Sequence, residues 1–514
     1  MTLRSEKAGK CIGFLNRRIS PPTLAAAGIS LIIFTYVAMR AANIPITHDE
    51  ALTYAWHVTG GWRDIVLFRT TGLPDNNHVL YTLLCKISVK LFGVSELTLR
   101  LPSILGCLLY LIGLNLCLKR MIPGWRQVLG ILAVGTNPYV LDFLGLARGY
   151  GLGLGFTMIG LNALLAAFAE SPGKILSLPL KLSLLFFTLA TLSNLSFLLV
   201  LAAALLIISL SLAYGGTSLS LSLMPDESPW AVLLKILLSM LPLFAYLIIP
   251  LSIIHHSKLF EMGGSTGFWP DTVGSLIEGT MYDTPLLAAQ KWLLEIWLSV
   301  TLLFLPLGLW VLHRWDKRRF TALMVMVTLI GIIVLESLAQ HLLFNVAFLQ
   351  GRRGIFLIPL FLLVALVLGH LPRATSRWIG TVGLLVGVLV PAALGVNGLL
   401  SANLRYVYDW KSDAGTREIM LAVKKKIDRQ KPSLPLRMRV NWNFEPGTNF
   451  YRHTMGIESS LLPLNREGLD GSADLYYGMR EDDATIMKYS PRLIFRDSVS
   501  DTALFERVNK RFMR

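Results

Sequence analysis

An acidic pair stands where the first apolar stretch of the chain ends. Asp49 and Glu50 lie within the run 46–54, directly after His48. A carboxylate at such a place can act as a general base that takes a proton from a hydroxyl or an amine. The same residues also suit a helix start, with Asp49 as the cap and Glu50 in the first turn, where both favour the helix dipole. The spacing alone leaves both interpretations open.

Three arginines could hold an anion. Arg148 lies just before the fourth apolar stretch, and Arg352 and Arg353 stand side by side before the tenth. A guanidinium can hold a phosphate through two parallel hydrogen bonds, which suits a phosphate carried by a lipid. The alternative is that these side chains only anchor the chain at the membrane surface, with their apolar stems lying along it.

Five further side chains could bind a substrate beside the acidic pair: His48, Tyr54, Asn77, His78 and Tyr81. Asn77 ends a turn that is marked by proline and paired asparagines at 74–77, and His78 and Tyr81 follow this turn. They could line a polar site that faces Asp49 across one loop. The alternative is that the turn simply starts the short apolar helix that follows it.

Metal ligands are also considered. His255, His256 and Glu261 have suitable side chains, but adjacent histidines on a loop more often form a solvated or interfacial turn. We therefore expect no metal site and no cofactor. A divalent ion could assist the chemistry, yet no ligand spacing in the sequence indicates one.

The composition divides the chain into two regions that must position these residues. The 514 residues are 54% hydrophobic and 16% charged, against about 25% charged in an ordinary soluble domain. Of the 80 charged residues, 35 lie in the last 114. We expect a membrane domain over 1–400, with a first outer loop at 43–100 that carries the catalytic residues, and a soluble domain over 401–514.

Eleven apolar segments approach the length of about 20 residues that a membrane-spanning helix needs. They are 24–42, 101–118, 128–143, 149–169, 175–193, 195–214, 231–254, 292–312, 321–340, 355–369 and 379–399. The segment 79–92 is apolar but too short to span comfortably, so it predicts an interfacial or re-entrant helix.

Charges in the connecting loops predict the orientation. With the N-terminus inside, the cytoplasmic connections contain Lys119, Arg120, Arg126, Lys174, Arg314, Lys317, Arg318, Arg319, Arg373 and Arg377. Basic residues are in excess on the cytoplasmic side of membrane proteins, which also accounts for the net charge of +16. We expect a multi-pass protein of the bacterial cytoplasmic membrane, with a cytoplasmic N-terminus and a periplasmic or extracellular C-terminal domain. Arg148, Arg352 and Arg353 then lie on the outer side.

The C-terminal region reads as a small α/β domain. Strand-like runs lie at 436–441 and 492–495, and a helical run lies at 414–426. The segment 441–445, together with Phe450 and Tyr451, offers aromatic rings and amides that suit sugar stacking. The core and turns of a small domain would use the same residues, and we favour that interpretation.

The order of the motifs resembles a known family. The chain presents Asp49-Glu50-Ala51 and Tyr54 after a span, then Asn77-His78 and Tyr81, then the runs 91–96 and 99–103, and then Ala147-Arg148-Gly149-Tyr150 after the third span. Over residues 1–160 this resembles the bacterial GT-C membrane glycosyltransferases. That group includes the protein O-mannosyltransferases, the aminoarabinose transferase that acts on lipid A, and the rhizobial lipopolysaccharide core transferases. Beyond residue 160 only the architecture is similar.

The resemblance implies an α-helical polytopic fold with an active site at the outer membrane face, a polyprenyl-phosphate-linked sugar donor and an inverting transfer. By motif position, Asp49, with Glu50 beside it, matches the family's acid that acts as base or orients the acceptor, and Arg148 matches a phosphate-binding arginine. Either acid could be the catalytic base, and we favour Asp49. Arg352 or Arg353 matches another. Relatives often have tyrosine after that arginine, whereas this chain has Gly354, and the second motif here lacks the family's proline, with Val79 in its place.

We therefore expect a glycosyltransferase whose partners are a polyprenyl-phosphate-linked donor, a lipid, glycan or protein acceptor of the cell envelope, and the bilayer. One alternative is a transporter or flippase for lipid-linked sugars, which would place polar groups deep in several spans. Another is a ligase or polymerase of envelope glycans. Clustering of the ionisable residues at one face favours the transferase. Nucleic-acid binding is not expected, because the chain has no basic stripe with interleaved aromatic residues.

Overall fold

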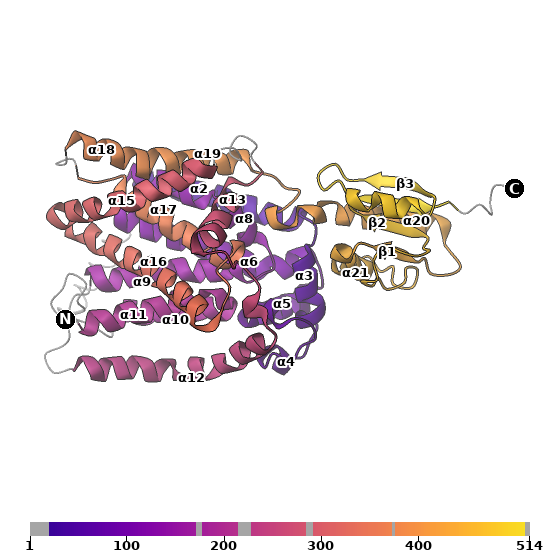
Figure 1. Ribbon diagram of the computed structural model, residues 1–514, viewed down its shortest axis with the longest axis horizontal. Coiled ribbons are helices and arrows are strands. Elements are labelled where there is room, and N and C mark those ends of the chain that lie inside the picture. Colours follow the sequence, from indigo (N-terminus) through magenta and orange to yellow (C-terminus); the bar gives the residue numbers. More distant parts are fainter. Residues whose placement is uncertain (1–19, 171–176, 214–227, 284–290, 373–375, 509–514) are drawn as a thin grey trace, which may run out of the picture.

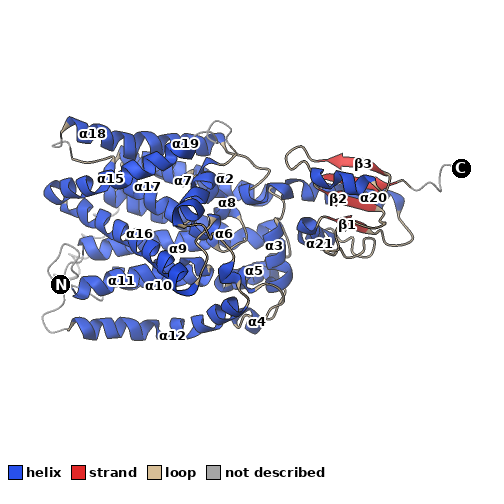
Figure 2. Ribbon diagram, viewed as in Figure 1, coloured by secondary structure: helices blue, strands red, loops and turns tan. Residues whose placement is uncertain are grey.

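The computed structural model describes residues 20–170, 177–213, 228–283, 291–372 and 376–508. A helical membrane body forms one part of the molecule and a smaller domain with a β-sheet forms the other (Figures 1 and 2). The last helix of the body ends at Leu400.

Long helices make up the membrane body. They are α2 (Pro21–Asn43), α6 (Glu96–Met121), α7 (Trp125–Gly135), α8 (Pro138–Gly145), α9 (Tyr150–Glu170), α10 (Leu178–Ser193), α11 (Leu198–Ala213), α12 (Pro229–His256), α15 (Lys291–Trp315), α16 (Lys317–Phe344), α17 (Leu357–Leu368), α18 (Arg377–Leu384) and α19 (Val390–Leu400). Most of them run along the long axis of the molecule (Figure 1).

Each of the eleven segments that the sequence predicts as spans contains helix in the residues that the structure describes. Among the described residues, eight helices are long and apolar enough to cross a membrane, and the bent pair α7–α8 makes a ninth candidate. The helices α10 and α17 are apolar but shorter, with 16 and 12 residues. Twelve residues rise about 18 Å, so α17 covers only part of a hydrocarbon core of about 30 Å. The α-helical polytopic membrane fold is confirmed.

The third predicted span, 128–143, was expected to be one helix and is two. The helices α7 and α8 meet at 71°. Asn137 caps α8 by accepting a hydrogen bond from the backbone N–H of Val140 at 3.1 Å, and Pro138 takes the first position of α8. Proline cannot continue the preceding helix but is well suited to start a new one. The bend redirects the chain toward Arg148.

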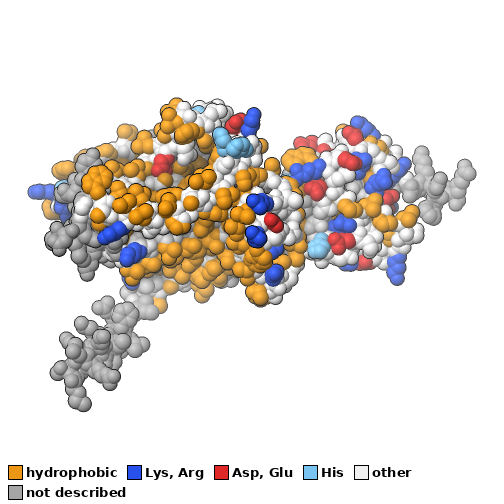
Figure 3. Space-filling model, turned by 90° about the horizontal axis from the view of Figure 1, so that it is seen from below, with side chains coloured by type: hydrophobic (Ala, Val, Ile, Leu, Met, Phe, Trp, Pro, Cys, Tyr) orange, Lys and Arg blue, Asp and Glu red, His pale blue; other side chains and the backbone are white. Residues whose placement is uncertain are grey.

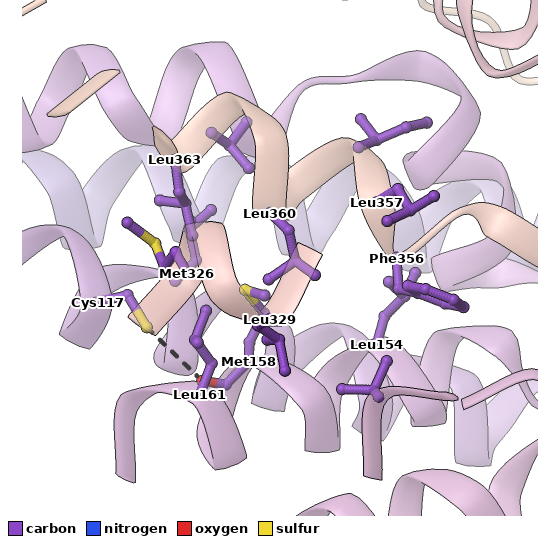
Figure 4. Packing of buried hydrophobic residues seen from close by; sticks show 14 of the residues in the cluster. Cys117, Leu154, Met158, Leu161, Met326, Leu329, Phe356, Leu357, Leu360 and Leu363 are labelled. Carbon is purple, nitrogen blue, oxygen red and sulfur yellow. Dashed lines mark hydrogen bonds between the residues drawn. The ribbon is translucent and has the colours of Figure 1, made fainter. Parts of the chain in front are cut away.

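Helix α17 lies inside the bundle. Eleven of its twelve residues are buried, and Figure 4 shows Leu360 and Leu363 packed near Leu329 and Met326 of α16. A helix that is hydrophobic all round has to be surrounded by protein or lipid. The short turn η6 (Gly351–Gly354), which contains Arg352 and Arg353, lies just before this buried helix and is held in place by it.

The outer surface of the membrane body is apolar. Leu31, Leu303 and Leu342 are 64%, 81% and 80% exposed. Figure 3 shows hydrophobic side chains over most of the visible face of the body, whereas charges gather on the smaller domain. An apolar surface of this extent needs a bilayer to cover it.

Short elements connect the long helices, and those of residues 48–92 lie at the end of the body that faces the smaller domain (Figure 1). They are α3 (His48–Leu52), η1 (Thr53–Val58), α4 (Trp62–Val66), η2 (Pro74–Asn76), α5 (Val79–Phe92), η4 (Leu259–Glu261), η5 (Phe268–Val273) and α13 (Gly274–Met281). Helix α5 has the bounds that the sequence predicts for a short interfacial helix.

The C-terminal domain is the predicted α/β unit. Its four strands, β1 (Met438–Val440), β2 (Leu475–Gly478), β3 (Pro491–Arg496) and β4 (Ala503–Arg507), form a sheet in the order β1-β2-β4-β3. Strand β1 is parallel to β2, and the other pairs are antiparallel. The helices are α20 (Thr416–Gln430), α21 (Glu445–Thr454) and α22 (Asp483–Met487).

The two parts share one hydrophobic cluster. Ile46 and Ala51 from the first loop belong to the same buried cluster as Ile419 of α20 and Tyr451 of α21. The Tyr451 hydroxyl also accepts a hydrogen bond from the backbone N–H of Ile46 at 2.9 Å. Because these contacts are buried, the C-terminal domain fixes the chain segment that leads into Asp49.

Candidate active site

Asp49 lies between two guanidinium groups. Its Oδ2 atom is 3.1 Å from Nη2 of Arg148 and 3.0 Å from Nη2 of Arg352. The Asp49 side chain is 15% exposed, Arg148 is 3% exposed and Arg352 is 33% exposed. Three residues that are far apart in the sequence, and that the sequence singles out separately, therefore meet at one end of the membrane body.

The charges of this cluster shift the pKa of Asp49. Burial raises the pKa of this carboxyl, but Arg148, Arg352 and His48 outweigh burial and hold it below its usual value. Burial lowers the pKa of Arg352, whereas the charge of Asp49 raises it. The pKa of Arg352 lies above its usual value as a result. Asp49 is therefore ionised and Arg352 is cationic at neutral pH.

Helix α3 is capped by Thr47 rather than by Asp49. Thr47 occupies the cap position, and its backbone N–H donates to Oε2 of Glu50 at 3.0 Å. The alternative in which Asp49 caps the helix is therefore wrong, because the helix starts at His48 and Asp49 already belongs to its first turn. This frees the Asp49 side chain to face the arginines.

Glu50 has a different environment from its neighbour. It is completely buried and forms a bidentate ion pair with Arg100 of α6, with Oε2–Nη2 and Oε1–Nε distances of 2.6 and 2.8 Å. The backbone N–H of Ala147 also donates to Oε1, at 2.6 Å. Glu50 thus connects the first loop, α6 and the residue that precedes Arg148.

Arg148 is held from several sides at the start of α9. Its Nη1 donates to Oδ1 of Asn76 and lies 3.5 Å from Oγ1 of Thr53. Its buried Nε has no hydrogen-bond partner among the described residues. Buried polar atoms normally have a partner, so this guanidinium has donor capacity left for a ligand.

Arg352 contacts the same oxygen of Asp49 from the turn η6. Its guanidinium stacks over the ring of Trp410 at 4.8 Å, and Nη1 is 3.5 Å from Oδ2 of Asp409. Arg353 points away, toward the carbonyl of Met262. The turn η6 therefore brings one of the two predicted arginines to Asp49 and turns the other toward a neighbouring loop.

The segment η8 (Tyr408–Gly415) supplies residues that the sequence did not indicate. Besides Asp409 and Trp410, it contributes Asp413, which accepts a hydrogen bond from the backbone N–H of His48 at 2.7 Å. Burial raises the pKa of both aspartates. The signal in the sequence was a group of acidic and aromatic residues just after the last span (Tyr408, Asp409, Trp410 and Asp413), and nothing local shows that this segment returns to the first loop.

His48 and Tyr54 both face the C-terminal domain. The His48 Nδ1 is 2.6 Å from the carbonyl of Asn443, and its ring meets Trp442 edge-on at 5.7 Å. Tyr54 packs edge-on against Phe450 at 5.6 Å. Both side chains lie at the boundary between the two parts, beside Asp49 in the sequence.

Asn77 and His78, which form the second motif, are both buried. The Asn77 amide donates to the carbonyl of Ile65 at 2.8 Å, and the His78 ring lies 5.8 Å from that of Tyr150. Burial lowers the pKa of His78 far below its usual value, and Arg148 lowers it further, so His78 is neutral. Tyr81 is fully buried, and its hydroxyl donates to the carbonyl of Leu99 at 2.8 Å. Tyr81 therefore belongs to the core beneath the site.

The aromatic run of the C-terminal domain is mostly core. Phe444, Phe450 and Tyr451 are buried, as the favoured interpretation of this run predicts. Trp442 is the exception at 56% exposed, and it lies next to His48. Within the described part of the chain, no cluster of three or more His, Cys, Asp or Glu residues could hold a metal ion.

An apolar cavity of about 620 Å³ lies among α13, α15, α16 and α17. Phe268, Trp297, Gly331 and Phe361 are among its lining residues. Leu357 and Ile358, which also line it, follow η6 and Arg352 in the sequence. A cavity of this size and character can accept part of a hydrocarbon chain.

Comparisons with known proteins give distant similarities only. No family model matches the chain, and a search of curated proteins finds no match. Among solved structures, ArnT from Cupriavidus metallidurans bound to undecaprenyl phosphate is similar with a TM-score of 0.49 and 14% identity, over 95% of this chain and 98% of that one. The same protein in the apo state gives a TM-score of 0.49 and 13% identity, over 94% of this chain and 97% of that one.

An oligosaccharyltransferase from Archaeoglobus fulgidus, in complex with Zn and sulfate, is similar with a TM-score of 0.38 and 12% identity, over 92% of this chain and 73% of that one. At identities of 14% or less and TM-scores below 0.5, these similarities do not establish the activity or the site residues of this chain. The function proposed below rests on the site's own geometry.

Proposed function

We propose that this chain is a GT-C-type glycosyltransferase that moves a sugar from a polyprenyl-phosphate-linked donor to an acceptor of the cell envelope. The observation that carries the proposal is the ionised Asp49 between Arg148 and Arg352 at one end of an apolar helical body. We further propose that this end faces the outside of the bacterial cytoplasmic membrane and that the N-terminus is cytoplasmic.

The proposed reaction needs few groups. The acceptor oxygen attacks the anomeric carbon of the sugar, the bond from that carbon to the phosphate oxygen breaks, and the electron pair leaves with the polyprenyl phosphate. Asp49 takes the acceptor proton. The leaving phosphate gains negative charge as it departs, and the guanidiniums of Arg148 and Arg352 stabilise that charge. Attack from the face opposite the phosphate inverts the anomeric centre.

The charges of Asp49, Arg148 and Arg352 suit a donor that carries one negative charge. Two arginines and one ionised aspartate leave one net positive charge, which matches the single negative charge of a phosphodiester donor. Asp409 lies at the edge of this cluster, 3.5 Å from Nη1 of Arg352, and burial raises the pKa of its carboxyl. Arg353 lies outside this balance, because it points to the Met262 carbonyl.

The distribution of ion pairs favours a transferase over a flippase. The pairs Arg40–Asp142, Arg100–Glu50 and Arg148–Asp49 are the buried ones in the described body, and each lies near the first loop or the C-terminal domain. A transport path would need polar groups along the whole length of the bundle. A ligase or polymerase of envelope glycans would use the same chemistry and is separated from a single-sugar transferase by its product.

Replacing Arg148 tests the phosphate role. We expect Arg148→Ala to raise the KM for the lipid-linked donor by roughly 10- to 100-fold, because a hydrogen bond to a charged group contributes about 1.5–3 kcal/mol. The measurement is the rate of sugar transfer in isolated membranes as a function of added donor lipid. Arg353→Ala is the matched control and should leave the KM unchanged. Equal effects of the two variants would contradict the assignment.

Filling the apolar cavity tests the place of the lipid chain. A Cβ at Gly331 meets no atom within 4 Å, so Gly331→Phe can project a ring into the cavity without a backbone clash. We expect an increase of about tenfold in the KM for long-chain donors, since displacing two methylene-sized groups costs about 1.5 kcal/mol. Gly380→Phe on α18, also unobstructed, is the control. A short-chain donor that is affected as strongly as a long-chain donor would contradict this placement.

A further inference from the structure

The two arginines contact one and the same atom. Nη2 of Arg148 and Nη2 of Arg352 both lie about 3 Å from Oδ2 of Asp49. An oxygen that accepts two charge-assisted hydrogen bonds is poorly placed to take a proton. The residue proposed as the base and the residues proposed to bind phosphate are therefore bound to one another.

Arg148 is the more firmly held of the two arginines. It is 3% exposed, Asn76 accepts a hydrogen bond from its Nη1, and its Nε remains unpartnered among the described atoms. A guanidinium that is held at one edge and has an unused N–H donor can bind a phosphate without changing its orientation.

Arg352 is free to change partners. It is 33% exposed and lies on the single turn η6, and its second ionic contact, to Asp409, is long at 3.5 Å. The guanidinium carbon of Arg352 also lies 4.8 Å from the centroid of the Trp410 ring, which is a cation–π contact. Asp49 is thus its strongest anionic partner, and a phosphate offers more acceptor oxygens than one carboxylate.

We propose that Asp49 is an internal ligand of the donor phosphate site and that the incoming phosphate displaces it from Arg352, so that the base is released only when the donor is bound. This inference rests on the proposed function and adds an order to it: donor first, acceptor second. No covalent step is involved, because the displacement exchanges one set of ion pairs for another.

A binding experiment separates this inference from a merely catalytic role. The Asp49→Asn protein lacks the competing charge, so it should bind undecaprenyl phosphate about tenfold more tightly than the wild type, although it cannot use the donor. The probe is undecaprenyl phosphate itself, titrated into the full-length protein in lipid nanodiscs and quantified by native mass spectrometry. Asp49→Ser is the second variant, with the same expectation, should Asp49→Asn fail to fold.

The control removes a charge of the same sign on the same face. Asp283 pairs with Lys411 at 2.6 Å, and both are part-exposed. Asp283→Asn should bind undecaprenyl phosphate with the affinity of the wild type. If its affinity rises as much as that of Asp49→Asn, the proposed competition between Asp49 and the phosphate would be overturned. Affinity of Asp49→Asn that is equal to or below that of the wild type would also overturn it. No binding of the probe by any variant would instead contradict the proposed function.

Discussion

An Asp49→Asn protein is expected to lose sugar transfer by roughly 10²- to 10⁴-fold while it still inserts into the membrane and folds. General-base assistance contributes about this factor, and the amide cannot take the acceptor proton. The side chain is nearly isosteric and can still accept from Arg148 and Arg352, so the surrounding structure should persist. The measurement is single-turnover transfer in membranes that contain equal amounts of each protein.

Two controls accompany this prediction. Asp283→Asn removes an aspartate of the same face that lies outside the cluster and should keep wild-type transfer. Asp409→Asn removes the more distant carboxylate that faces Arg352 and should reduce transfer less than Asp49→Asn does. Normal transfer by Asp49→Asn would assign the base to another residue.

A Glu50→Gln protein is expected to lose stability, by about 3–5 kcal/mol. The amide leaves the fully buried Arg100 guanidinium without its counter-charge, and breaking a buried ion pair by removal of one partner has a cost of this size. Thermal unfolding in detergent measures the loss. We expect a large decrease in the midpoint temperature, and transfer per folded molecule that falls far less than in Asp49→Asn.

An exposed ion pair provides the control for the Glu50→Gln variant. Glu278 lies 2.5 Å from Lys291, but both side chains are well exposed, so Glu278→Gln should change stability by no more than about 1 kcal/mol. Unchanged stability of Glu50→Gln together with lost transfer would make Glu50 the base. The neighbouring acids 49 and 50 would then exchange their proposed roles.

Local sequence patterns predicted most of the elements. The apolar lengths predict the helices, the short segment 79–92 predicts α5, and the charge density predicts the C-terminal domain. The bend at Asn137 was missed because apolar content continues through it, although Asn-Pro is a signal that could have found it. The apolar content of a segment indicates whether it is surrounded by lipid, protein or water. It does not indicate where the helix bends.

The site needed information that is not local. The sequence predicted Asp49, Arg148 and an arginine of the pair Arg352–Arg353 as site residues. It could not indicate which of the two adjacent arginines contacts Asp49, because their side chains leave the same turn in different directions. Tyr81 was nominated and lies in the core. Asp409 and Trp410 were missed because only the packing of the C-terminal domain on the first loop brings them to Arg352.

The most direct test is mass spectrometry of envelope lipids, glycans and proteins from cells that lack this protein and carry either the wild-type gene or the Asp49→Asn variant. We expect one sugar to be missing from one acceptor in the Asp49→Asn cells and restored by the wild type, with the unused polyprenyl-phosphate-linked sugar accumulating. Restoration of that sugar by Asp49→Asn, or no difference in any envelope sugar, would contradict the proposed transfer.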